Sequence, residues 1–410
     1  MYLKISKVFY TILLFYMAWF QAAFFHINHL LLLLGFLTIF PILIHMYINK
    51  VNILKMFPIE IMLWFIFGLV VLFVSFFNAP DQQLHMSSMF TYFQFLLLTW
   101  AVFYIIFNER KIDFFLDTFI LLALLSAFTA IIISHDFGGG RISMGPNNNP
   151  NSLGLTMVFA IGFLLFKLNS DSLISVILSF IIILFLTYVV ILTGSRKSLL
   201  SVIIVIIFWF IMVLFSNFKN ANTITKMKHI FLVIILLFTI NLFSNYFFKD
   251  SIIFTRLTRL FQEGDKIRSD MYSEALIIFK QYPLFGAGMQ QYRVLSKYQT
   301  YSHSTYAELL SNTGLIGSII YSATFISLGL KYVKKSFFNN YNHKEMLEFR
   351  MFLIMLLIVI FLGFSIIHFY DLISFVFFGI MIGHYNLNKE GKKEKKNVKM
   401  EYHKKDTKKT

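Results

Sequence analysis

Long apolar segments alternate with short polar ones along most of the chain. An α-helix of about 20 apolar residues crosses the ~30 Å hydrocarbon core of a bilayer and satisfies its own backbone hydrogen bonds there. The pattern therefore predicts an all-α, polytopic membrane protein. About twelve transmembrane helices are expected, near residues 8–25, 29–48, 57–77, 89–107, 114–134, 152–167, 174–193, 198–216, 229–247, 313–332, 350–367 and 370–386. Only Ile366 to Asp371 separates the last two, which leaves one long bent helix as an alternative.

The largest polar interruption, about Phe248 to Tyr306, is rich in Arg and Gly. It predicts a large extracytoplasmic loop that contains short helices. One of these should start at Ser269 or Asp270, both good N-caps, directly after Arg268. A helix N-terminus beside an arginine favours a bound anion, and the apolar face of this helix is typical of a helix lying along a membrane surface. Pairing of Arg268 with a nearby Asp is the plainer alternative.

The composition supports the same class. Hydrophobic residues make up 58% of the chain and charged residues only 14%, more apolar surface than a soluble globule can bury. The net charge of +16 lies mostly in short loops and the C-terminal tail, which indicates membrane topology rather than nucleic-acid binding. With a cytoplasmic N-terminus, 25 of the 36 Lys and Arg residues fall in cytoplasmic segments. Both termini are therefore predicted inside, and the long loop outside the cytoplasmic membrane.

Two units follow from this pattern. Residues 1–387 form the multi-span membrane domain, with the catalytic loop at about 248–306. Residues 388–410 are rich in Lys and nearly free of apolar side chains, so they are predicted to be a disordered cytoplasmic tail that contacts anionic membrane lipids.

Two short polar segments outside the membrane are candidate binding sites. The first is the loop from Asp136 to Gly154, which contains Arg141 and Asn151. Its glycines free backbone N–H groups for close approach to a ligand, and Asn149-Pro150-Asn151 makes a compact cap before the sixth predicted span. A tight surface turn explains it equally well. The second is Gly194-Ser195-Arg196, which interrupts about forty apolar residues and has no acid within ten residues on either side. An arginine there needs a partner, either lipid phosphate or a diphosphate held beside the turn and the hydroxyl.

His303 precedes the predicted span 313–332, and histidine is the side chain best suited to accept a proton near neutral pH. Tyr306 or Glu308 on the following turn could orient it. A structural role for this lone histidine remains the alternative. The chain has no Cys, and its His and acidic residues form no cluster with the spacing of metal ligands. We therefore expect neither a metal site nor a cofactor.

Three segments together resemble the O-antigen ligase and polysaccharide polymerase superfamily of bacterial envelope enzymes. They are Thr193-Gly-Ser-Arg196, Pro283-Leu-Phe-Gly286-Ala-Gly288, and His303-Ser-Thr-Tyr306 followed by Glu308 and Gly314-Leu-Ile-Gly317. Asn149-Pro150-Asn151 is a further similar feature, and the likeness spans roughly residues 140–320. Family members often have Asn after this histidine, whereas this chain has Ser304.

The resemblance implies an enzyme that transfers a glycan from undecaprenyl diphosphate to an acceptor sugar hydroxyl outside the cytoplasmic membrane. It further implies an inverting, metal-independent reaction in which Arg196 and Arg268 hold the diphosphate and His303 is the general base. The partners are then the lipid-linked oligosaccharide, the acceptor glycan and other polysaccharide-assembly proteins. Residues expected to contact substrate are Gly194, Ser195, Arg141, Asn151, Tyr306, Glu308, Gly286 and Gly288.

The residue usage favours one member of this class. Abundant Ile, Phe, Lys and Asn are typical of an AT-rich genome, often that of a low-GC Gram-positive bacterium without lipopolysaccharide. This favours a polymerase of capsular or extracellular polysaccharide over an O-antigen ligase that uses a terminal acceptor. A lipid-linked oligosaccharide flippase is the alternative from another class, but transport predicts ionisable residues at mid-bilayer, and the predicted spans are nearly free of them.

Overall fold

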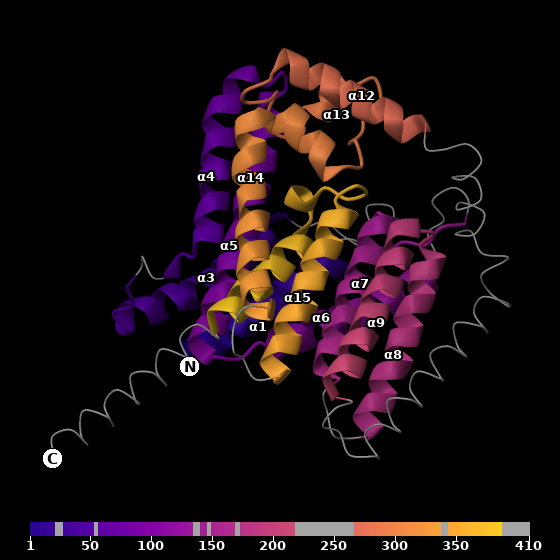
Figure 1. Ribbon diagram of the computed structural model, residues 1–410. Coiled ribbons are helices and arrows are strands. Elements are labelled where there is room, and N and C mark those ends of the chain that lie inside the picture. Colours follow the sequence, from indigo (N-terminus) through magenta and orange to yellow (C-terminus); the bar gives the residue numbers. More distant parts are fainter. Residues whose placement is uncertain are drawn as a thin grey trace, which may run out of the picture.

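The computed structural model describes residues 1–20, 28–52, 56–133, 140–145, 149–168, 173–217, 266–337 and 343–387. These residues form helices joined by short turns, and they contain no strand. Most of the helices run side by side in one bundle (Figure 1). The main helices are α1 (Tyr2–Phe15), α3 (Asn28–Ile48), α4 (Ile59–Val74), α5 (Gln82–Glu109), α6 (Asp113–Ile133), α7 (Pro150–Lys167), α8 (Leu173–Leu192), α9 (Arg196–Asn217), α12 (Lys266–Gln281), α13 (Tyr292–Leu295), α14 (Thr305–Phe337) and α15 (His343–Leu362).

Seven of the described helices are long and apolar enough to cross a membrane, and Ile59–Phe73 and Leu372–Leu387 are shorter apolar helices. The chain is therefore an integral membrane protein built from helices. The predicted span 229–247, the loop up to residue 265 and the tail 388–410 lie outside the described residues, so the count of twelve spans stays a prediction. The last two predicted spans are separate, because α15 ends at Leu362 and the next helix begins at Leu372.

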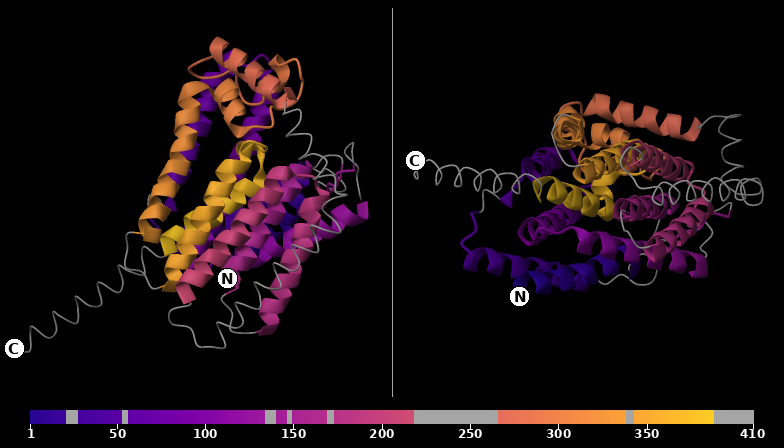
Figure 2. Two further views of the ribbon diagram at one scale, coloured as in Figure 1. Left: turned by 45° about the vertical axis from the view of Figure 1, so that its right-hand side comes forward. Right: turned by 60° about the horizontal axis from the view of Figure 1, so that its bottom comes forward.

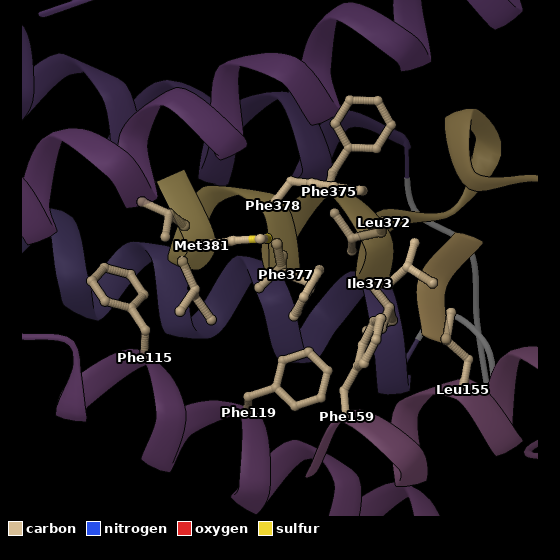
Figure 3. Packing of buried hydrophobic residues seen from close by; sticks show 14 of the residues in the cluster. Phe115, Phe119, Leu155, Phe159, Leu372, Ile373, Phe375, Phe377, Phe378 and Met381 are labelled. Carbon is tan, nitrogen blue, oxygen red and sulfur yellow. The ribbon is translucent and has the colours of Figure 1, made fainter. Parts of the chain in front are cut away.

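Aromatic side chains hold the centre of the bundle together. On α7, Phe159 stacks on Phe377 with ring centroids 4.5 Å apart and planes 14° apart. Phe119 of α6 meets Phe163 of α7 edge to face. Figure 3 shows Phe159, Phe119 and Phe115 facing the helix that carries Phe377. The helix Leu372–Leu387 is therefore a central element of the fold, although it is one of its shorter apolar helices.

Charged pairs gather near the end of the bundle where α5, α7 and α14 finish. Lys7 pairs with Glu109, and Lys167 pairs with Asp117. Near the end of α14, Lys331 pairs with the buried Glu60. The sequence assigned these three lysines to the cytoplasmic side, and the structure places them at one end of the bundle.

The opposite end carries the short helices α12 and α13. They lie over the N-terminal part of α14 and the end of α4, above the ends of α7 and α9 (Figures 1 and 2). Their own small core consists of Ala275, Ile278, Ala287 and Tyr292. The helix predicted from Ser269 or Asp270 is already helical from Lys266, so Arg268 lies in its first described turn instead of ahead of it. On α12, Met271, Ala275 and Ile278 are buried, whereas Leu276 and Ile277 are exposed.

Candidate functional site

The helix α14 is broken one third of the way along, and residues 283–288 fill the break. Gly314 there has φ 63° and ψ −166°, a conformation outside the helical region. Gly286, with φ 74°, lies so close that a Cβ added to it would come 2.3 Å from the backbone of Asn312. Only glycine fits at these positions, because both need positive φ and closely approaching backbone.

Backbone hydrogen bonds join the two segments on both sides of the break. N–H groups of residues 287 and 288 donate to carbonyl oxygens of α14 before Gly314, and N–H groups after Gly314 donate to carbonyl oxygens of residues 283 and 284. The pairs are Ala287 to Ser311 (2.9 Å), Gly288 to Asn312 (2.9 Å), Leu315 to Pro283 (2.9 Å) and Ile316 to Leu284 (3.1 Å). The glycine-rich motif thus satisfies the backbone groups that the break would otherwise leave without partners.

The segment 363–371 between α15 and the following helix connects the three predicted functional segments. The carbonyl oxygen of Phe364 accepts hydrogen bonds from Lys197 Nζ of α9 (2.6 Å) and from the Tyr272 hydroxyl of α12 (3.4 Å). The ring of Tyr306 on α14 lies 4.6 Å from that of Phe364. Lys197 follows Arg196 directly, and Tyr272 is one helical turn from Arg268. The segments that carry Arg196, Arg268 and His303 therefore converge on Phe364.

A second contact joins the loop after α6 to α7 and α9. Arg141 donates through Nε to the carbonyl oxygen of Thr193 (2.8 Å) and through Nη2 to Oδ1 of Asn151 (3.0 Å). Asn149 caps α7 by accepting from the backbone N–H of Asn151 (2.8 Å). The predicted cap is thus confirmed, and Arg141 and Asn151 lie beside the turn at Gly194, which has φ 62°.

A cavity of about 280 Å³ opens between this region and the α13–α14 segment. Nine of its eleven lining residues have polar side chains, and the lining comes from the N-terminus of α7, from residues 290–293, from residues 301–308 and from residues 365–371. The lining residues are Asn149, Ser152, Gln290, Arg293, Tyr301, Glu308, Ser365, Ile366, Ile367, Tyr370 and Asp371.

Glu308 anchors one wall of the cavity and is only 1% exposed. Its carboxylate accepts hydrogen bonds from the backbone N–H of Ser302 (2.7 Å) and from Nδ2 of Asn312 (2.5 Å). The Tyr370 hydroxyl accepts from the backbone N–H of Gln290 (2.8 Å) and from Asn312 (3.2 Å). This network fixes the backbone directly before His303 and joins residues 302–312 to residues 290 and 370.

His303 lies next to the cavity wall, because its ring contacts the lining residue Tyr301. It has φ 57°, a left-handed conformation that His tolerates better than most residues. Its ring makes an edge contact with Tyr301 at 4.5 Å, and the Tyr301 hydroxyl accepts from Asn149 Nδ2 (2.7 Å). The hydroxyl of Tyr306 donates to the carbonyl oxygen of Ile360 (2.6 Å), so this tyrosine ties α14 to α15.

The remaining predicted contact residues have clear structural roles. The Ser195 hydroxyl is buried next to that of Ser198 (2.8 Å), at the start of α9. Gly154 of α7 lies against this pair, since a Cβ there would come 2.5 Å from Ser198 Oγ. Gly286 and Gly288 serve the break in α14 as described above. Roles of these residues in substrate contact stay predictions.

Sequence reasoning missed Arg293, Tyr301, Tyr370 and Asp371. The signal for Asp371 was present, because an acid between two apolar helices is costly and marks a functional position by default. Arg293 was one basic residue among several in the long loop. Nothing in the sequence showed that residues 365–371 would form a cavity wall.

Burial raises the pKa of the Asp371 carboxyl from its usual 3.8 to about 6, while hydrogen bonds from Ser374 act in the opposite direction. Because the pKa of this carboxyl is higher in the folded than in the unfolded protein, protonation of Asp371 stabilises the fold. This contribution is complete below about pH 4 and is lost as the pH rises through about 6. We expect the melting temperature of the detergent-solubilised protein, measured relative to Asp371→Asn, to increase between pH 7 and pH 5. The charged and titratable groups near position 371, which are Arg293, Glu308, Tyr370 and His368, are the same in the wild type and in Asp371→Asn. A melting-temperature difference between these two proteins that does not change with pH would contradict the raised pKa of Asp371.

These features define a polytopic helical membrane protein with a cavity at one end of its bundle, lined mainly by residues with polar side chains. Residues 180–322 match the family described as O-antigen ligase. Over this region, about a third of the chain, the sequence is similar to that family, which supports the resemblance to the O-antigen ligase and polysaccharide polymerase superfamily. The matched region contains Arg196, Arg268 and His303, and it supports an O-antigen ligase- or polymerase-type function in broad terms. A search of curated proteins found no match.

Proposed function

We propose that this protein polymerises capsular or extracellular polysaccharide at the outer face of the cytoplasmic membrane. It would transfer a glycan from undecaprenyl diphosphate to a sugar hydroxyl of the next lipid-linked repeat unit. The observation that carries the proposal is the convergence of the three functional segments on Phe364, beside a polar cavity. Both termini would then lie in the cytoplasm, on the side of the Lys7 and Lys331 ion pairs.

The proposed reaction is a displacement at the anomeric carbon. The acceptor oxygen bonds to this carbon while the bond to the diphosphate oxygen breaks, and undecaprenyl diphosphate leaves with the bonding electrons. Arg196 and Arg268, both half-buried, stabilise the charge that develops on the leaving diphosphate. His303 accepts the proton of the acceptor hydroxyl as the new bond forms. Attack from the face opposite the leaving group inverts the anomeric centre.

Lys197 adds to the positive charge on this side. Its Nζ lies 2.6 Å from the Phe364 carbonyl oxygen and 5.4 Å from the centre of the Phe364 ring. These contacts hold the lysine ammonium group at the start of α9, where Arg196 also lies. The positive end of the helix dipole supports anion binding at the same point.

The proposal is tested by deleting the gene and restoring it as wild type, Arg196→Ala or Arg268→Ala. Loss of one arginine should lower the polymerisation rate by about 10²- to 10³-fold, because each stabilises the leaving group in the transition state. Single repeat units should then replace long polymer on gels of extracted glycan. Lys280→Ala is the matched control, since it removes an exposed positive charge from the same helix as Arg268.

The other candidate functions give different products in the deletion strain. A ligase would leave full-length polymer on the lipid carrier. A flippase would leave single lipid-linked repeats on the cytoplasmic side of the membrane, out of reach of an externally added glycosidase. Wild-type polymer length in both arginine variants would contradict the proposed mechanism.

A further inference from the structure

The two polar areas at this end of the bundle differ in charge. Arg196, Lys197 and Arg268 belong to the segments around Phe364 and are all basic. The cavity instead has two carboxylates, Glu308 and Asp371, and one basic side chain, Arg293. A diphosphate carries several negative charges, and like charges at close range in a partly buried site repel strongly. The cavity is therefore a poor diphosphate site.

The cavity suits a neutral, polyhydroxylated ligand. Its volume is about 280 Å³. This is slightly below the range of pockets that hold drug-sized ligands, so the cavity has room for about one sugar ring. Its wall offers hydrogen-bond donors on Arg293 and acceptors on Asp371, as hydroxyl groups of a sugar require. Ile366 and Ile367 add apolar surface for the ring carbons.

Asp371 is held in place by hydrogen bonds that use only some of the acceptor positions of its carboxylate. One of its carboxylate oxygens accepts hydrogen bonds from the backbone N–H of Ser374 (2.8 Å) and from the Ser374 hydroxyl (2.7 Å). A carboxylate has about four acceptor positions, so about two remain for a ligand. Across the cavity, Arg293 Nη1 donates to Oε1 of Gln290 (3.3 Å), which leaves most of its five N–H groups for further bonds.

The cavity also lies next to the proposed base. Tyr301 is a cavity wall residue and contacts the His303 ring. We propose that this cavity is the acceptor subsite, and that Asp371 and Arg293 bind hydroxyl groups of one acceptor sugar so that its attacking hydroxyl lies toward Tyr301 and His303. This inference rests on the proposed function and assigns the donor diphosphate and the acceptor sugar to separate areas.

The test separates donor from acceptor in a purified system. The donor is the labelled lipid-linked repeat unit extracted from the deletion strain, and the acceptor is the same repeat released from its lipid by mild acid. Asp371→Asn and Arg293→Gln should each raise the KM for the released oligosaccharide about tenfold, the cost of weakening one charged hydrogen bond. The KM for the lipid-linked donor should change less than twofold. Arg268→Ala should show the opposite pattern.

Two controls guard against loss of fold. Glu274→Gln removes a carboxylate of α12 that pairs with Lys297 outside the cavity wall, and its kinetic constants should match wild type. Arg293 is exposed, so Arg293→Gln is expected to fold even if Asp371→Asn does not. Unchanged acceptor KM in both cavity variants, or a raised donor KM, would overturn the acceptor assignment and leave the polymerase proposal standing. Absence of transfer by the wild-type protein would overturn the polymerase proposal itself.

Discussion

Replacing His303 with alanine should lower the rate of glycan transfer by about 10²- to 10⁴-fold, the usual contribution of a general base. The acceptor hydroxyl has a high pKa, and without a base its proton has no acceptor as the new bond forms. The loss should appear in kcat with little change in the KM for donor or acceptor, because the imidazole acts in the transition state. Initial rates with the purified protein and labelled lipid-linked repeat would measure it.

His303→Asn separates the chemistry of the ring from its structural role. The residue has φ 57°, and asparagine adopts this left-handed conformation more readily than alanine. The asparagine variant should therefore keep the loop conformation and the melting temperature, yet be as inactive as the alanine variant. Activity within threefold of wild type in His303→Asn would remove His303 as the base.

The sequence predicted the features that depend on local chemistry. Asn149 caps α7 because its side chain bonds to a backbone group two residues away, and such a pattern can be read in one dimension. The positions of most long helices follow from runs of apolar residues in the same way. The sequence also indicated the region of the candidate site, since Arg196 and His303 interrupt sequence that is otherwise apolar.

The parts that escaped depend on contacts between distant segments. Asp371 and Arg293 face the same cavity from positions 78 residues apart in sequence, and neither has a neighbour that marks it as a pair. The glycine motif at 283–288 was interpreted as a substrate contact, and its packing into α14 was not foreseen. Its hydrogen-bond partners lie on α14 after His303 and at Ser75 and Asn78, more than 200 residues earlier, beyond the reach of any local pattern.

That packing predicts a large effect on stability. Gly286→Ala should destabilise the folded protein by at least about 4 kcal/mol, in the range of the most damaging single substitutions. Positive φ costs alanine about 1–2 kcal/mol. The larger cost is steric, because the new Cβ would lie 2.3 Å from the backbone carbonyl carbon and oxygen of Asn312. Neither segment can move away without breaking the four hydrogen bonds across the break in α14.

The melting temperature in detergent should fall by on the order of 10 °C in Gly286→Ala, and the amount of protein in the membrane should fall with it. Gly35→Ala is the matched control, since a Cβ there has no atom within 4 Å, and its melting temperature should be equal to wild type or slightly higher. Gly288→Ala should fall between them, because its φ is 108° but its nearest contact is the Ala79 methyl at 3.0 Å. Equal melting temperatures for the Gly286 and Gly35 variants would show that the break in α14 does not depend on residues 283–288. The expected order of stability also connects the fold to the site. The break in α14 that Gly286 permits lies six residues after Glu308, which lines the cavity and whose carboxylate accepts a hydrogen bond from Asn312 beside the break.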